Sequence, residues 1–312
     1  MKYLVCGEAL IDLIHDESNT WIAHQGGGPF NTAIALARLG ESVAFLGRLS
    51  GDSWGRSLEN ALLAAGVLPE RIVPAAEPTS LAVVEVSDNG KADYTFYLSG
   101  TSNFAWKSTE LPASLDGYQL LHIGTLALVV EPSNEILFEW LKRCQDEALI
   151  MIDLNARPSV ISDASNYLAL IKPWLSIADV IKASDDDLKF LYPDLTWQAA
   201  VAEIFSQSRV SLFAITAGAA GAHLVTREVL VSAAAPKVPV FDTVGAGDTF
   251  SAGLISMLAA SKLIEKNQLA HASTAQLQSA LEFAVAAAAM SCTKPGAQSP
   301  TRSEVESLLN DN

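Results

Sequence analysis

The sequence is poor in cysteine and in positive charge, and both shortages exclude classes of function. Its three cysteines, Cys6, Cys144 and Cys292, are far apart and form no C-x-x-C pair, so neither a disulfide framework nor a cysteine-based metal site is expected. Twenty Lys and Arg residues against 35 Asp and Glu give a formal net charge of -15. We expect no nucleic-acid partner, because phosphate neutralisation needs clustered cations.

The sequence also lacks several kinds of segment. No signal pattern precedes the first apolar run, and runs such as 283–290 are too short to span a bilayer. We therefore expect a cytoplasmic protein with buried thiols and no membrane partner. No G-x-x-x-x-G-K-[ST] occurs, which disfavours a P-loop kinase. Residues 7–9 (GEA) do not supply the G-x-G-x-x-G that a dinucleotide-binding dehydrogenase carries after its first strand.

What is present favours an α/β fold in a single domain over residues 1–312. Half of the residues are apolar and 18% are charged, so a large core is available. After residue 110, strand-like runs at 120–123, 150–153, 180–182 and 211–216 alternate with helical patterns at 134–147, 165–172 and 197–205. Earlier strands are expected at 3–7 and 43–47. This alternation is typical of βαβ units and of a mainly parallel sheet.

A second, smaller sheet is predicted from residues 13–25 and 79–104. The runs 81–86 and 92–98 flank Asp88-Asn89-Gly90, which is a strong hairpin signal. These antiparallel pieces are too few to form a core alone, so we expect them to project from the main domain as a lid. Phe96 and Tyr97 would then present an aromatic wall to a ligand. The alternative is a dimerisation sheet, and both roles are compatible.

Polar residues follow the predicted parallel strands and should converge on one edge of the sheet, where ligands bind in such folds. They include His122, Asn155, Arg157, Lys182, Ser184, Thr216, Gly218 and Gly221. His122 lies in a strand-like run, so we expect a core residue or a wall of the substrate pocket there rather than a metal ligand. Asp187 belongs to an acidic helix start at 184–187, which would cap the helix whatever the function, or orient Mg²⁺ through water. Residues 293–297, with Gly296, follow an alanine-rich helix and are expected near an adenine.

Two glycine-rich turns carry the strongest signals. Residues 242–250 (DTVGAGDTF) are expected to form a strand end, a glycine loop and the start of a helix, with the short β-branched run of Val238 and Val240 as the strand before them. The free amides of a helix start can hold a phosphate, and Asp248 beside them can accept a proton from a hydroxyl. The alternative is that Asp248 and Thr249 are only N-caps.

The other turn, residues 26–31 (GGGPFN), opens a helix with Asn31 in its first turn. A flexible turn explains this segment equally well. Asp12 interrupts an apolar run, and a carboxylate there needs a partner. We interpret it as a ligand for hydroxyl groups rather than as a strand-end residue facing water.

Together these residues resemble the ribokinase-like (PfkB) carbohydrate kinases, and the fructokinases among them, over essentially the whole chain. The resemblance implies a three-layer α/β/α fold with a β-sheet lid. It implies that Asp248 is the catalytic base and that Gly245, Ala246 and Gly247 form an anion hole. It also implies sugar contacts from Asp12, Gly27, Gly28 and Asn31, and nucleotide contacts from Thr216, Gly218, Gly221 and the 182–184 segment.

Residues 122–128 (HIGTLAL) and 153–157 (DLNAR) look most like the fructokinase group, where the arginine, here Arg157, is expected near substrate and transferred phosphate. ATP and Mg²⁺ are the implied cofactors, with a monovalent cation such as K⁺ near Asp242 as a family-level expectation. The chain departs from the family pattern at Ser184-x-x-Asp187, where relatives carry Asn-x-x-Glu, and at Leu98, where many carry arginine.

The resulting expectation is an ATP-dependent kinase that phosphorylates the primary hydroxyl of a sugar, with fructose to fructose 6-phosphate as the favoured reaction. Ribose, 2-keto-3-deoxygluconate and nucleosides remain alternative substrates. A catalytically silent family member that binds sugar is the alternative from another class. The expected partners are a sugar, ATP and a second copy of the chain bound through the lid sheet.

Overall fold

The fold is organised around an eight-stranded sheet in the order β14-β13-β12-β11-β10-β9-β1-β4. The computed structural model describes residues 1–15, 20–86, 92–265 and 268–311. Six strands of this main sheet are parallel, and β13 and β14 are antiparallel. The strands are β1 Lys2–Cys6, β4 Ser42–Leu46, β9 Leu120–Gly124, β10 Leu149–Asp153, β11 Val180–Ser184, β12 Leu212–Thr216, β13 Ala222–Val225 and β14 Leu230–Ala233.

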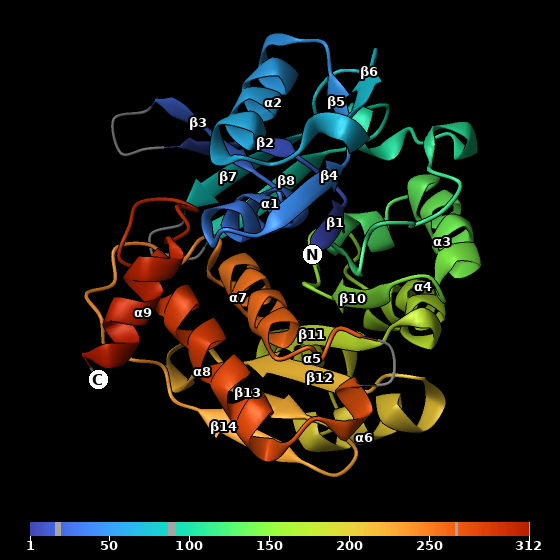
Figure 1. Cartoon of the computed structure of the whole chain (residues 1–312). Coiled ribbons are helices and arrows are strands. Elements are labelled where there is room, and N and C mark those ends of the chain that lie inside the picture. The colour runs from blue at the N-terminus through green and yellow to red at the C-terminus, as the bar shows by residue number, and fades with distance from the viewer. Residues whose placement is uncertain (16–19, 87–91, 266–267, 312) are drawn as a thin grey trace.

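Helices cover both faces of the main sheet, so the predicted three-layer α/β/α class is confirmed. One layer contains α1 Gly28–Arg38, α2 Ser53–Ala65, α7 Ala246–Ala260, α8 Thr274–Ser291 and α9 Arg302–Asn310. The other contains α3 Ser133–Cys144, α4 Ala164–Ile177, α5 Asp185–Leu191 and α6 Trp197–Gln207. In Figure 1, α1 and α7 lie next to one another in the middle of the view.

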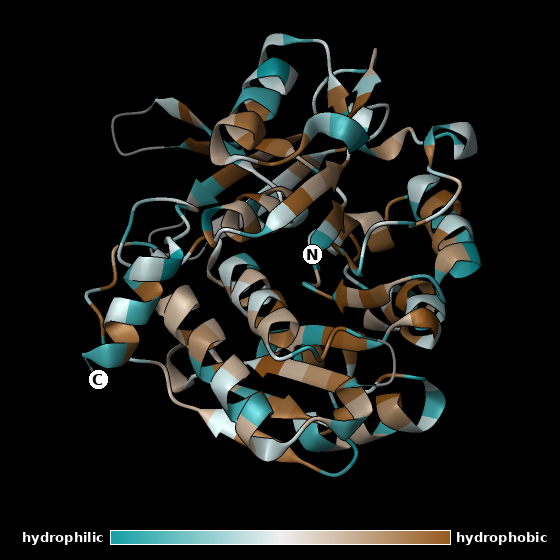
Figure 2. Ribbon diagram, in the orientation of Figure 1, coloured by the Kyte–Doolittle hydropathy of each residue, from teal (hydrophilic) through white to brown (hydrophobic). Residues whose placement is uncertain are grey.

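The alternation of side chains along each strand divides the interior into two cores. In β1, Tyr3 and Val5 point into the core beneath α1 and α7, whereas Leu4 and Cys6 point into the core beneath α3 and α4. Successive residues of a strand face opposite sides, and strands covered on both faces become hydrophobic throughout. Figure 2 shows β10 and β12 hydrophobic over most of their length, while α2 carries both hydrophobic and hydrophilic residues.

The second, smaller sheet, called the small sheet below, has the order β3-β2-β7-β8. Its strands are β2 Leu10–His15, β3 Trp21–Gly26, β7 Leu81–Val86 and β8 Ala92–Tyr97. The predicted pairing of 81–86 with 92–98 is confirmed as an antiparallel pair; the predicted turn at 88–90 lies outside the described residues. The small sheet begins at Leu10, three residues earlier than expected. Two short strands, β5 Arg48–Ser50 and β6 Val73–Ala75, form a third sheet.

Two local predictions were wrong. The helix expected to end before Pro173 continues to Ile177, because Pro173 is exposed and continuation buries Trp174, Leu175 and Ile177. No strand contains Val238 or Val240, since Pro236 and Pro239 remove backbone donors there. Among the described helices, none is both long and apolar enough to cross a membrane.

Candidate active site

The site begins at the N-terminus of α7, which lies at the carboxyl edge of the main sheet. Gly245 is the N-cap, with φ 75°, and no side chain caps the first amides of the helix. The alternative that Asp248 or Thr249 serves as an N-cap is therefore wrong. A Cβ at Gly245 would lie 2.7 Å from Cβ of Ala297, and one at Gly247 would lie 3.0 Å from Nζ of Lys182. The turn is thus a bare cradle of amides that suits an anion.

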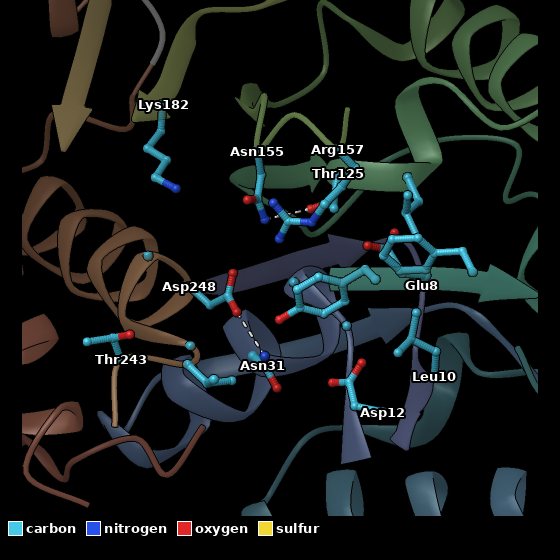
Figure 3. A pocket seen from close by; sticks show the side chains of 18 residues that line it. Glu8, Leu10, Asp12, Asn31, Thr125, Asn155, Arg157, Lys182, Thr243 and Asp248 are labelled. Carbon is cyan, nitrogen blue, oxygen red and sulfur yellow. Dashed lines mark hydrogen bonds between the residues drawn. The ribbon is translucent and has the colours of Figure 1, made fainter. Parts of the chain in front are cut away.

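Asp248 joins this cradle to the first turn of α1. Nδ2 of Asn31 donates to Oδ2 of Asp248 at 2.8 Å, across 217 residues of sequence, and Figure 3 shows the two side chains facing one another. Burial raises the pKa of Asp248 to about 6; the Asn31 hydrogen bond opposes this rise and the charge of Asp153 adds to it. A carboxylate with such a pKa is ionised at neutral pH and can accept a proton from a hydroxyl.

Two strained loops form the wall that faces α7. Thr125 follows β9 with φ 61°, and Asn155 follows β10 with φ 34°, conformations that non-glycine residues rarely adopt. Nδ2 of Asn155 donates to Oγ1 of Thr125 at 3.2 Å, which ties the loops together. Arg157, two residues further on, reaches into the same space (Figure 3). Both strained residues therefore serve to place side chains at the sheet edge.

These elements enclose a cavity of about 320 Å³, called the central cavity below. Asp12, from β2 of the small sheet, lines it, and burial raises the pKa of Asp12 to about 6, with Arg157 opposing the rise and Asp248 adding to it. In Figure 3, Lys182 lies at one end and Glu8 at the other. Glu8 is 1% exposed, and among the described residues neither carboxyl oxygen has a partner with good hydrogen-bond geometry. Burial raises the pKa of Glu8 to about 8.

The ammonium group of Lys182 lies next to the amide cradle and forms a buried ion pair with Asp153. Nζ of Lys182 lies 3.1 Å and 3.0 Å from the two carboxylate oxygens of Asp153, and Oγ of Ser251 donates to the same carboxylate at 3.4 Å. Burial works against the ammonium, but Asp153, Asp187 and Asp248 outweigh it and raise the pKa of Lys182. Lys182 therefore remains protonated, and its ammonium group lies next to Gly247, where an anion would bind.

Most predicted site residues converge here. The central cavity is lined by Asp12, Gly27, Gly28, Asn31, Phe96, Asn155, Arg157, Lys182, Gly245, Gly247 and Asp248. Ala246 lies within the same turn but does not line the cavity. Thr216, Gly218 and Gly221 lie beyond it at the end of β12, where Gly218 is exposed.

His122 was expected in the substrate pocket, and the structure places it elsewhere. It lies inside β9, opposite Val5 and Met151, is 1% exposed and does not line the cavity. Neither ring nitrogen has a hydrogen-bond partner in the part of the chain that the structure describes, and burial lowers the pKa of His122 to about 3, so the ring is neutral. The side chain sits two residues before the strand end, too early to reach the sheet edge.

The acidic start of α5 caps its helix, as predicted. Oγ of Ser184 accepts from the amide of Asp187, and Oδ2 of Asp187 accepts from the amide of Ser184 at 2.7 Å. Oδ1 of Asp187 accepts from the amide of Ala156 at 2.8 Å. Both carboxylate oxygens are thus engaged, which fits contact with a metal through water better than direct ligation. Across the described chain, no cluster of three His, Cys, Asp or Glu residues could hold a metal ion.

Asp242 joins two loops beside the amide cradle. Its Oδ1 accepts from the amide of Val244 at 3.0 Å, and its Oδ2 accepts from the amide of Gly296 at 2.9 Å. Gly296, expected near an adenine, lines a different cavity that also touches Asp12 and Asn31. The predicted monovalent-cation residue therefore holds the loop that follows α8 against the start of α7.

Sequence reasoning missed several residues of the central cavity. Glu8, Leu10, Tyr94, Thr125 and Leu126 also line it. Tyr94 could have been found from strand alternation, because it shares a strand face with Phe96 and Leu98. Glu8 carries no such signal, since nothing local indicates that a glutamate after a first strand will be buried.

The arrangement defines a class of protein, a phosphotransferase in which a carboxylate base and a ring of amides meet over a polar cavity. The pattern of the pfkB family carbohydrate kinases matches residues 1–304, and the chain belongs to this family.

Individual relatives agree with that assignment. The chain is 36% identical over 273 residues to a fructokinase of Rhizobium leguminosarum bv. trifolii, covering 86% of this chain and 82% of the relative. A crystal structure of fructokinase with bound ATP from Xylella fastidiosa superposes with a TM-score of 0.87 at 30% identity, covering 99% and 98% of the two chains. A Vibrio cholerae O395 fructokinase double mutant, bound to fructose, ADP and potassium ion, gives a TM-score of 0.85 at 25% identity, covering 99% and 98%.

Proposed function

We propose that this protein is an ATP-dependent fructokinase that transfers the γ-phosphoryl group of ATP to the 6-hydroxyl of fructose. The observation that carries the proposal is Asp248, a buried carboxylate hydrogen-bonded to Asn31 and set beside uncapped helix amides. A central cavity of about 320 Å³ with polar walls suits a monosaccharide. The fructokinases that resemble the chain over most of its length favour fructose over ribose, 2-keto-3-deoxygluconate or a nucleoside.

The reaction follows from the positions of the side chains. Asp248 accepts the proton of the sugar hydroxyl while the oxygen attacks the γ-phosphorus, and the bond from that phosphorus to the ADP oxygen breaks. The amides of 245–247, the ammonium of Lys182 and the guanidinium of Arg157 stabilise the negative charge on the transferring group. Asp12, Gly27, Gly28, Asn31 and Asn155 orient the sugar, so that one hydroxyl faces Asp248.

The residues present fit ATP with a divalent cation, and we assign Mg²⁺ to this role. The cation supplies neutralisation of the phosphate charges, which an acidic chain needs in order to bind ATP. Asp187 would hold it through water, and Ser184, Thr216, Gly218, Gly221 and Gly296 would line the nucleotide site. Asp242 would lie beside a K⁺ ion; the Vibrio cholerae relative contains potassium.

We further propose that the small sheet acts as a lid on a single kinase domain and that it also pairs two copies of the chain. Phe96 reaches from β8 into the central cavity, so closure of the sheet would exclude water from the reaction. Trp21, Ile22 and Tyr97 are 46%, 44% and 59% exposed on the small sheet, which favours a second copy as their cover. The use of ATP as a substrate and the three unpaired cysteines favour a cytoplasmic location.

A catalytically silent sugar binder is not favoured. Sugar binding alone does not require a carboxylate base next to helix amides that no side chain caps. The test is ADP release from ATP with Mg²⁺ on a panel of fructose, ribose, 2-keto-3-deoxygluconate and nucleosides, with and without K⁺. Turnover on fructose with the product phosphorylated at the 6-hydroxyl is expected. Turnover on another acceptor only would move the substrate assignment, and sugar binding without any turnover would support the silent binder.

A further inference from the structure

A second cavity lies beside the proposed substrate pocket, and apart from Asp12, Asn31, Asp242 and Gly296 its lining residues have no assigned role in the proposed reaction. Its volume is about 600 Å³, against about 320 Å³ for the central cavity. It is bounded by the small sheet, by α1 and by the loops 241–244 and 295–299. Its lining is mixed: Ile14, Phe30, Ile34, Val84 and Phe241 are apolar, whereas His24, Gln25, Arg38, Asp242, Gln298 and Ser299 are polar. The apolar side chains can receive an apolar group beside the polar ones.

The register of the small sheet explains why there are two cavities. Phe96, Ala82 and Asp12 are neighbours across β8, β7 and β2, and both Phe96 and Asp12 line the central cavity. Two residues earlier in β8, Tyr94 lies in a row with Val84 and Ile14. All three residues of that second row line the second cavity. The two rows meet at the boundary between the cavities, because Asp12 of the first row and Tyr94 of the second line both.

Four residues line both cavities and form the boundary between them: Asp12, Asn31, Tyr94 and Val244. Asn31 is held by Asp248, and Tyr94 has the largest side chain of the four. The ring of Tyr94 stacks on Phe96 with centroids 5.8 Å apart and planes at 12°. A ring fixed in this way is a wall whose removal would join the two cavities.

We propose that Tyr94 is a specificity-determining residue that confines the substrate to an unsubstituted monosaccharide by separating the sugar pocket from the apolar side chains of the second cavity. This role of Tyr94 depends on the proposed function in one respect, which is that fructose is taken as the sugar. When the ring is absent, the second cavity accepts an apolar substituent carried by the sugar, because Ile14, Val84 and Phe241 are already placed to receive it. The hydroxyl of Tyr94 is not needed for this role, since the ring forms the partition.

The test compares fructose with two derivatives that keep the 6-hydroxyl free, one benzylated at the anomeric oxygen and one at O1. In Tyr94→Ala, kcat/KM for at least one derivative relative to fructose should rise about tenfold or more, the range that pocket shape commonly contributes. Tyr94→Phe retains the ring and should keep the wild-type ratio. Tyr97→Ala is the matched control, because Tyr97 is on the same strand but 59% exposed.

Unchanged ratios for both derivatives in Tyr94→Ala, or an equal rise in Tyr97→Ala, would overturn the proposal. If Tyr94→Ala does not fold, Tyr94→Val removes the ring and suits a strand. Calorimetric affinities of the same three ligands give a second readout. If the wild-type protein binds fructose without turnover, the proposed function fails, while the affinity ratios still decide the role of Tyr94.

Discussion

The helices α5 and α7 both start at the carboxyl edge of the main sheet with an acidic residue in the first turn. In α5, both carboxylate oxygens of Asp187 accept backbone amides, from Ser184 and Ala156. In α7, Asp248 caps nothing and is held by one side-chain amide, that of Asn31. Asp187 therefore has one amide on each oxygen, which fixes the helix start and leaves contact with a metal only through water, whereas Asp248 keeps Oδ1 free of such contacts within the described residues and faces the cavity.

The largest effect should come from Asp248→Asn. The amide cannot accept a proton from the sugar, but its oxygen still accepts the Asn31 hydrogen bond, so the fold should be retained. We expect kcat to fall by about 10²–10⁴-fold with sugar binding preserved. Steady-state kinetics and calorimetry measure the two quantities. Asp12→Asn is the control from the same cavity and should raise KM more than it lowers kcat. Normal turnover in Asp248→Asn would contradict the assignment of the base.

The next effect is the pH dependence of the reaction. Burial raises the pKa of Asp248 to about 6, and that of Asp12 likewise. The base works only when ionised, so kcat/KM should be constant near neutral pH and fall as pH decreases through 6, by about tenfold per unit for one group. A pH profile of kcat/KM measures this limb. A limb that stays near pH 4, the ordinary range of an aspartate, would mean that Asp248 is not the group being titrated.

The smallest effect concerns the other helix. Asp187→Ala removes two amide acceptors from a buried position and should lower the free energy of unfolding by about 1–2 kcal/mol. Thermal unfolding compares it with Asp186→Ala, a matched variant, since Asp186 is exposed on the same turn. Equal stability of the two variants would show that the contacts of Asp187 do not matter to the fold. If Asp248→Asn lowered the free energy of unfolding as much as Asp187→Ala does, the two carboxylates would not differ in their contribution to stability.

Much of this organisation could be predicted from local signals. The βαβ alternation predicted the parallel sheet, and residues at strand ends, such as Asn155 and Arg157, converged as expected. For His122 the core interpretation is confirmed and the substrate contact is not, because a position two residues inside β9 faces the core. The prediction that the helix ends before Pro173 was wrong, because the burial of Trp174 and Ile177 outweighs the one backbone hydrogen bond that is lost at this exposed proline.

Other features depend on contacts that no local pattern contains. The partnership of Asn31 with Asp248 joins residues far apart in the chain. The burial of Glu8 and the ion pair between Lys182 and Asp153 exist only because several strand ends and α7 meet. Sequence periodicity describes which face of an element is buried, but not which elements will cover it.

The contact between Asn31 and Asp248 also has a consequence for protein synthesis. A ribosome that reads this message produces the part of the site that contains Asp12 and Asn31, the proposed sugar contacts, long before residue 248 of the 312 has been made. The base and its amide cradle arrive together, on one helix, late in translation. Nascent chains and chains truncated before α7 therefore lack a centre that could hydrolyse ATP wastefully.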